Sequence, residues 1–127
     1  FVEAGENDNL MVQKVAADPT AVGVLGYSFL EENQDKVRPI ELGGVMPTAA
    51  TIQNLSYPGA RRLYLYVKGE HVEAKPSIRQ FLSSYAQSWA PGGLLEQRGL
   101  VPFAGADAQA ANAQAAGLKP LDAASLK

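Results

Sequence analysis

The sequence predicts an α/β fold, in which strands alternate with helices along the chain. Short apolar runs bounded by turn residues, such as Ala21–Gly26, are typical of strands buried in a parallel sheet. Other segments have apolar residues at helical spacing, and residues 77–89 are the clearest of these. The elements are few for a doubly wound domain, so we expect the chain to be one part of a longer protein.

Residues 7–42 are expected to form two helices and two strands. In chain order these are a helix that ends at Asp18–Pro19, the strand Ala21–Gly26, a helix over residues 27–35 and a strand over residues 37–42. Asp8 or Asn9 is the expected N-cap of the first helix, since both side chains accept hydrogen bonds from free helix amides. Pro39 lacks an amide hydrogen, so the last strand is expected at a sheet edge.

The rest of the chain is expected to add one strand and several helices. First come a helix that Thr48 caps and that ends at Asn54, a strand over residues 61–67 and a polar loop over residues 68–75. A helix over residues 77–89 follows, with a helical piece within residues 92–99 and an extended segment over residues 100–103. The chain closes with a helix over residues 107–116 and a tail from Lys119. In the strand, Leu63, Leu65 and Val67 share one face, and Tyr64 and Tyr66 share the other.

The helix over residues 77–89 has the clearest apolar stripe, and Pro76 stands at its first position. The stripe consists of Ile78, Phe81, Leu82, Tyr85 and Trp89. No basic residues interleave with these aromatic side chains, so we expect core packing and no stacking on nucleic-acid bases. The helix over residues 107–116 is rich in alanine, which favours helix formation but offers little bulk for packing.

Composition excludes several classes of function. The chain has 127 residues and a net charge of −2, so no strongly basic surface is available for nucleic acid. It has no cysteine, which excludes disulfides and thiolate chemistry. No apolar stretch approaches the roughly 20 residues of a membrane-spanning helix, so we expect no membrane insertion. The single histidine, His71, has no identifiable partner, and we expect neither an enzyme nor a metal site.

Two ordered blocks of sequence carry a family resemblance. The first block comprises Glu6–Val15 and Asp18–Asn33, and the second comprises Val45–Ile52, Ser56–Pro58 and Arg61–Val67. In this order and spacing they resemble the phosphate-binding proteins of the PstS type, the periplasmic substrate-binding components of phosphate ABC transporters. The resemblance covers roughly residues 1–103 and suggests the C-terminal portion of such a protein. Thr20, Val24 and Asn7 depart from the family pattern and leave the subfamily open.

The resemblance implies a type II periplasmic-binding-protein fold, with two α/β lobes joined by hinge strands and a ligand in the cleft between them. The expected divisions are residues 1–42 as the end of the second lobe, residues 43–60 as the hinge crossover, residues 61–103 as the return into the first lobe, and residues 104–127 as an alanine-rich helix and tail. The chain would therefore form only part of this fold.

The resemblance also implies how proteins of this family bind phosphate, and we expect the main binding residues to lie outside this chain. The family's main ligands are a Ser-Gly-Thr helix start, an arginine and an aspartate, and no matching Ser-Gly-Thr motif occurs in this sequence. The candidates that remain are Asn7, Asp8, Asn9 and Tyr27, expected on the cleft wall of the second lobe. Ordinary helix capping is the default explanation for Asp8 and Asn9, and packing is the default explanation for Tyr27.

Other charged residues admit a structural explanation. The Arg61–Arg62 pair is a candidate for binding an anion or for contacting a permease, but two solvated charges at the edge of a strand explain it as well. Glu31 and Glu32 are expected on the wet face of a helix. No serine or carboxylate stands at a recognisable catalytic spacing from His71.

The expected function is phosphate binding for ABC-transporter import, without catalysis and without a cofactor. The expected partners are inorganic phosphate, the transporter permease, and either the rest of the same chain or a swapped copy of it. The expected location is the periplasm, or the cell exterior with a surface anchor. The alternatives are another oxyanion (sulfate, molybdate or a phosphonate) and a structural or adhesion protein on the same fold. A hydrolase is weaker, because it lacks a nucleophile–base pair.

Overall fold

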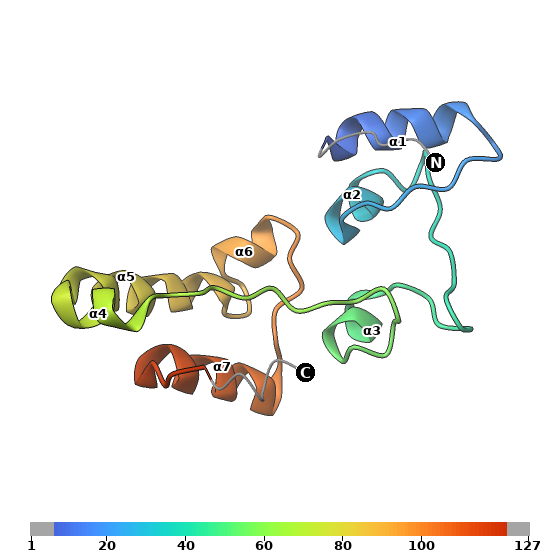
Figure 1. Ribbon diagram of the computed structural model, residues 1–127. Coiled ribbons are helices and arrows are strands. Elements are labelled where there is room, and N and C mark those ends of the chain that lie inside the picture. The colour runs from blue at the N-terminus through green and yellow to red at the C-terminus, as the bar shows by residue number, and fades with distance from the viewer. Residues whose placement is uncertain (1–6, 122–127) are drawn as a thin grey trace. The chain divides into compact units, whose positions relative to one another are not determined.

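The computed structural model describes residues 7–121, and the regular structure in this range is helical (Figure 1). Its helices are α1 (Asp8–Ala17), α2 (Tyr27–Glu32), α3 (Ala49–Gln53), α4 (Gly69–Ala74), α5 (Pro76–Ala86), the 3-10 helix η1 (Gln87–Trp89), α6 (Leu94–Gln97) and α7 (Gly105–Gly117). The chain divides into two compact units. The described part of the first is residues 7–61 and 98–101, and that of the second is residues 62–97 and 102–121.

The three predicted strands do not form in the described part of the chain, so the α/β prediction is not confirmed there. Residues 21–26, 37–42 and 61–67 have no neighbouring strand, and an isolated bridge joins Leu42 to Val45. A strand is stable only when its amides and carbonyls pair with a second extended segment. Residues 7–121 place no such segment beside these runs, so their strand propensity is not realised.

Helix α1 was predicted with Asp8 or Asn9 as its N-cap, and this prediction is wrong. The N-cap is Asn7, whose side-chain oxygen accepts a hydrogen bond from the Leu10 amide at 3.1 Å. All three residues favour caps, so local preference could not choose among them. Asp8 is instead occupied by a contact with another helix. The predicted end of the helix before Asp18–Pro19 is confirmed.

Helix α3 confirms the prediction that Thr48 caps it. The Thr48 hydroxyl accepts a hydrogen bond from the Thr51 amide at 3.2 Å, and the Thr51 hydroxyl accepts one from the Thr48 amide at 2.9 Å. This reciprocal capping box satisfies two amides that the helix itself cannot pair. A helix of five residues is too short to persist on propensity alone, so the box is important for its stability.

The polar segment over residues 68–75, predicted as a loop, forms α4. Its apolar residue Val72 is buried, and α4 packs beside α5. Glutamate and alanine favour helix, so a single buried side chain suffices to fix the turn against its neighbour. The predicted helical piece within residues 92–99 is confirmed as α6.

Helix α5 and η1 confirm the helix predicted over residues 77–89, with Pro76 at its start. Tyr85 stacks on Phe81 with ring centroids 5.5 Å apart, and it meets Trp89 edge-on at 5.7 Å. Leu82 is 3% exposed and lies in the core of the second unit. Phe81 is 58% exposed, so its predicted place in the core is wrong. It lies at the edge of the stripe, where packing against Tyr85 covers one ring face.

Helix α7 confirms the helix predicted over residues 107–116, and it packs beside α5. It also contacts η1, where the Trp89 indole nitrogen donates a hydrogen bond to the Asn112 side-chain oxygen at 2.9 Å. At its start, Asp107 forms an ion pair with Arg62 at 3.2 Å. The predicted tail from Lys119 lies partly outside the described residues, which end at 121.

Candidate functional site

The four predicted ligand residues lie at the starts of two helices in the first unit. Helix α1 starts with the N-cap Asn7, followed by Asp8 and Asn9 in its first turn. Tyr27 is the first residue of α2. Helices α1 and α2 pack against each other, as Figure 1 shows. The Asp8 carboxylate accepts a hydrogen bond at 3.3 Å from the amide of Gly26, the N-cap of α2. The fold therefore brings the starts of the two helices together.

Internal contacts use the hydrogen-bonding groups of most of these residues. Asn7 caps α1, and the Asp8 carboxylate accepts a hydrogen bond from the amide of Gly26, the residue that precedes α2. Asn9 is exposed, and its side chain makes no described hydrogen bond within residues 7–121.

Tyr27 is half-buried, and its phenol is held in the protonated form. Burial raises the pKa of Tyr27 above its ordinary value of 10.0, and a hydrogen bond to Glu31 and the charge of Glu31 raise it further. The Ala49 amide donates a hydrogen bond to the same oxygen, which lowers the pKa of Tyr27 by a smaller amount. The raised pKa favours the folded state at every pH below the ordinary value, and this stabilisation is lost as pH rises through the folded-state pKa.

Arg62 is held by contacts within the second unit. Besides its ion pair with Asp107, its guanidinium carbon lies 5.2 Å from the centroid of the Phe103 ring. Both partners of the ion pair remain substantially exposed, so the pair contributes little to stability. The predicted strand that Arg61 and Arg62 would flank does not form, but both residues are exposed as expected.

The remaining polar candidates lie on the surface. Glu31 and Glu32 are exposed on α2, as predicted, and His71 is exposed on α4. Residues 7–121 contain no group of three or more histidines and carboxylates that could hold a metal ion. None of the helices in that range combines the length and apolar character that a bilayer crossing requires.

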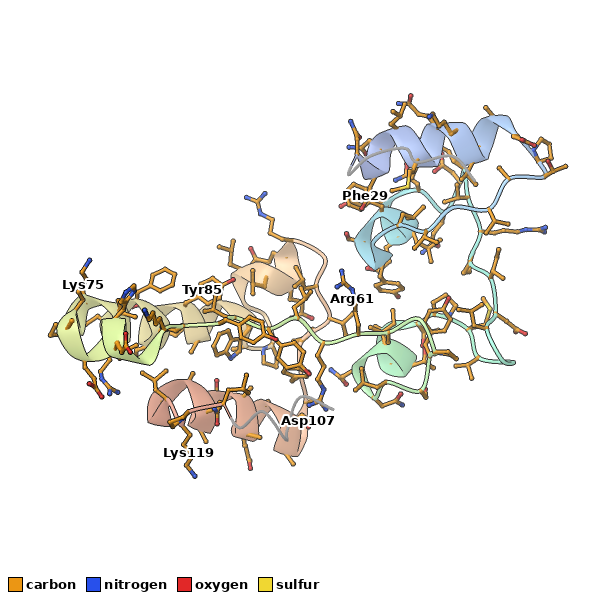
Figure 2. All side chains as sticks on the ribbon, in the orientation of Figure 1. Phe29, Arg61, Lys75, Tyr85, Asp107 and Lys119 are labelled. Carbon is orange, nitrogen blue, oxygen red and sulfur yellow. The ribbon has the colours of Figure 1, made fainter. Side chains whose placement is uncertain are left out.

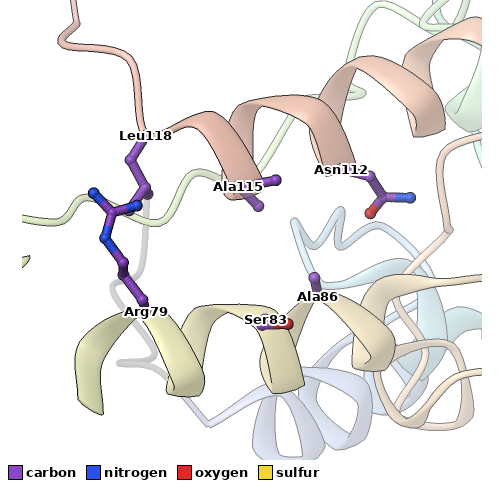
Figure 3. A pocket seen from close by; sticks show the side chains of 7 residues that line it. Arg79, Ser83, Ala86, Asn112, Ala115 and Leu118 are labelled. Carbon is purple, nitrogen blue, oxygen red and sulfur yellow. The ribbon is translucent and has the colours of Figure 1, made fainter. Parts of the chain in front are cut away.

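A pocket of about 380 Å³ lies between α5 and α7 (Figure 3). Its lining residues are Arg79, Ser83, Ala86, Asn112, Ala115, Ala116 and Leu118. Arg79 and Leu118 lie at one end of the pocket and Asn112 at the other. The alanines of α7 leave this space because their side chains cannot fill the gap between two helices. The pocket was not predicted, although the alanine run of the sequence indicated loose packing of this helix.

Comparison with known proteins identifies relatives of the chain. Protein SphX of Synechococcus elongatus is 34% identical over 106 residues, which cover 79% of this chain and 31% of SphX. Phosphate-binding protein PstS of Staphylococcus haemolyticus is 32% identical over 85 residues, which cover 63% of this chain and 27% of that protein. PstS of Staphylococcus aureus is 27% identical over the same length.

The chain thus spans less than a third of the length of these relatives. No family model matches the sequence, and no solved structure matches it. These relatives confirm the family that the sequence resemblance predicted. The chain therefore belongs with the phosphate-binding proteins of the PstS and SphX type, as a PstS-like C-terminal portion.

Proposed function

We propose that this chain is part of a protein that binds phosphate with high affinity for import by an ABC transporter and catalyses no reaction. The observation that carries the proposal is the similarity to SphX and to proteins named phosphate-binding protein PstS. Because the chain spans 31% of SphX, the activity of the whole protein is inferred from these relatives.

The proposed fold is that of a two-lobed periplasmic binding protein. In it, residues 1–42 finish the second lobe, residues 43–60 cross the hinge, residues 61–103 return to the first lobe, and residues 104–127 form an alanine-rich helix and tail. The change of compact unit between Arg61 and Arg62 supports a change of lobe near this point. The proposed partners are inorganic phosphate and the transporter permease, with no cofactor. The proposed location is the periplasm, or the cell exterior if the protein is surface-anchored.

Calorimetric titration of the protein in its natural full-length form tests this function. Phosphate is expected to bind at least about a hundredfold more tightly than sulfate or molybdate, since a carboxylate facing the ligand accepts the proton that only phosphate retains. Tight binding of sulfate or molybdate in place of phosphate would assign another oxyanion. Absence of heat with all three anions would overturn the proposal and favour a structural or adhesion role.

We further propose that Asn7, Asp8, Asn9 and Tyr27 lie on the wall of the phosphate cleft. Among the four, Asn9 has a side-chain amide that makes no described hydrogen bond within residues 7–121. Asn9→Ala and Tyr27→Phe are each expected to weaken phosphate binding about 2–10-fold, the effect of one lost hydrogen bond. Gln13→Ala removes an exposed amide from the same helix, one turn further on, and is the matched control. If all three variants and the parent protein bind phosphate with equal affinity, these residues serve only in helix capping and packing.

A further inference from the structure

The pocket between α5 and α7 combines a few polar side chains with an apolar lining. Its volume of about 380 Å³ lies near the lower end of the roughly 300–1,000 Å³ that ligand pockets occupy. Arg79, Ser83 and Asn112 supply its polar groups, and alanine and leucine side chains form the rest of its lining. Apolar walls with a small number of placed polar groups are typical of sites for small molecules.

Helical spacing places these groups along the pocket. Arg79 and Ser83 are separated by one turn of α5, so they share a face of that helix. Asn112 and Ala116 share a face of α7 in the same way. Figure 3 shows Arg79 at one end of the pocket and Asn112 at the other, with Ala115 between them. A molecule in the pocket would therefore meet a cation at one end and apolar surface further along.

The polar groups of the pocket have hydrogen-bond donors that are not in use. Within residues 7–121, the side chains of Arg79 and Ser83 form no described hydrogen bond or ion pair. The side-chain oxygen of Asn112 accepts from the Trp89 indole, which leaves the amide hydrogens of Asn112 as donors. None of the described lining residues is acidic. The pocket therefore suits a ligand that accepts hydrogen bonds and carries negative charge.

The balance of charge favours a carboxylate. Arg79 is the charged residue among the described lining residues, and its planar guanidinium can form two parallel hydrogen bonds to a carboxylate. One cation balances the single charge of a carboxylate. A phosphate monoester carries a charge of about −1.5 to −2 at neutral pH. Its second charge would remain unpaired beside apolar side chains, at a cost in free energy.

We propose that this pocket binds a small amphipathic carboxylate, a molecule with one carboxyl group and a short alkyl chain. Arg79 pairs with the carboxylate, Ser83 donates a hydrogen bond to it, and the alkyl chain packs against Ala86, Ala115 and Ala116. The pocket belongs to the second unit, whereas the candidate phosphate residues belong to the first. The proposal is therefore independent of the proposed phosphate binding.

Helix capping is the alternative role for Arg79. The last carbonyls of a helix attract cations, and Arg79 lies at the same end of the pocket as Leu118, the C-cap of α7. Local contacts already close this helix end, because the Leu118 amide donates to the Gln114 carbonyl at 2.9 Å. No hydrogen bond from Arg79 to α7 is described within residues 7–121. The guanidinium therefore remains available to a ligand.

Calorimetric titration of the natural full-length protein with octanoate tests the proposal. A small excess of phosphate is present, so that the proposed cleft is filled and the heat from octanoate reports a separate site. The expected dissociation constant is about 0.1–1 mM, a range suited to a ligand of about ten non-hydrogen atoms. Acetate lacks the alkyl chain and octanol lacks the charge, so each should bind at least about tenfold more weakly.

Two matched pairs of variants locate the site, whether or not the protein binds phosphate. Arg79→Gln should weaken octanoate binding at least about tenfold, and Arg98→Gln, at an exposed arginine outside the lining, less than about twofold. Ala115→Leu fills the pocket and should also weaken binding at least about tenfold. Ala113→Leu adds the same bulk at an exposed position of α7 outside the lining, and should change the affinity less than about twofold.

Four results would overturn the proposal. Absence of heat with octanoate, or heat that disappears when phosphate is added, would exclude a separate carboxylate site. Equal effects of Arg79→Gln and Arg98→Gln would place the bound acid elsewhere. A lower free energy of unfolding for Arg79→Gln with unchanged octanoate affinity would restrict Arg79 to helix capping. Tighter binding of octyl phosphate than of octanoate would exclude a site built for a single charge.

Discussion

Replacing Gly99 with alanine should lower the free energy of unfolding by about 3 kcal/mol. Gly99 has a φ of +84°, a left-handed backbone conformation that residues other than glycine adopt only at a cost in free energy. A Cβ at this position would lie 1.9 Å from the Cβ of Ser28 and 3.2 Å from its Cα. These atoms are fixed to the backbone at the start of α2, so the clash cannot be relieved by rotating a side chain. Urea denaturation measures the loss.

Gly44→Ala is the matched control for Gly99→Ala. Gly44 has a φ of +78°, close to that of Gly99, but a Cβ there would meet no atom within 4 Å. Gly44→Ala should therefore lower the free energy of unfolding by about 1–2 kcal/mol, the cost of the left-handed backbone alone. The difference between the two variants isolates the contact with Ser28. Equal losses would contradict the close approach of Gly99 to α2.

Leu82→Ala should produce the second large loss, about 2–3 kcal/mol. Leu82 is buried on α5, in the unit where α5 packs against α4 and α7. Truncation removes the apolar contacts of the side chain and leaves a cavity that the helices close only in part. Hydrogen exchange of α4, α5 and α7 should speed up together, because α5 packs against both of the other helices. Urea denaturation gives the overall change.

Leu94→Ala provides the comparison for Leu82→Ala, because this leucine lies largely in solvent. It should change the free energy of unfolding by less than about 0.5 kcal/mol. A large loss of unfolding free energy for Leu94→Ala, with little change for Leu82→Ala, would mean that Leu94 and not Leu82 belongs to the core of the second unit.

Local sequence patterns predicted most helices of this chain. Thr48, Pro76 and the alanine run each act through their own backbone turn, so the relevant interactions are a few residues apart. The run over residues 61–67 shows the opposite case. Its alternation is evident in the sequence, but a strand also requires a neighbour, and residues 7–121 do not place one there. Helix α4 was missed because a single buried residue, Val72, gives no periodicity.

The candidate site was predictable only in part. Asn7, Asp8 and Asn9 are recognisable as a helix start, but the sequence does not show which of them is the cap. The bond from the Gly26 amide to Asp8 joins residues far apart in the chain, so it depends on how α1 packs on α2. Similarly, the pKa of Tyr27 depends on burial and on Glu31 and Ala49, which only the folded structure brings to the phenol.

The hydrogen bond between Trp89 and Asn112 gives the molecule an optical reporter. Trp89 is the single tryptophan of the chain, so its fluorescence comes from one known place. Its indole nitrogen donates to a side chain of α7, whereas its ring meets Tyr85 of α5. Separation of α7 from α5 would expose the indole to water and shift its emission to longer wavelength. Emission from the unmodified protein therefore follows the association of these two helices without an added label.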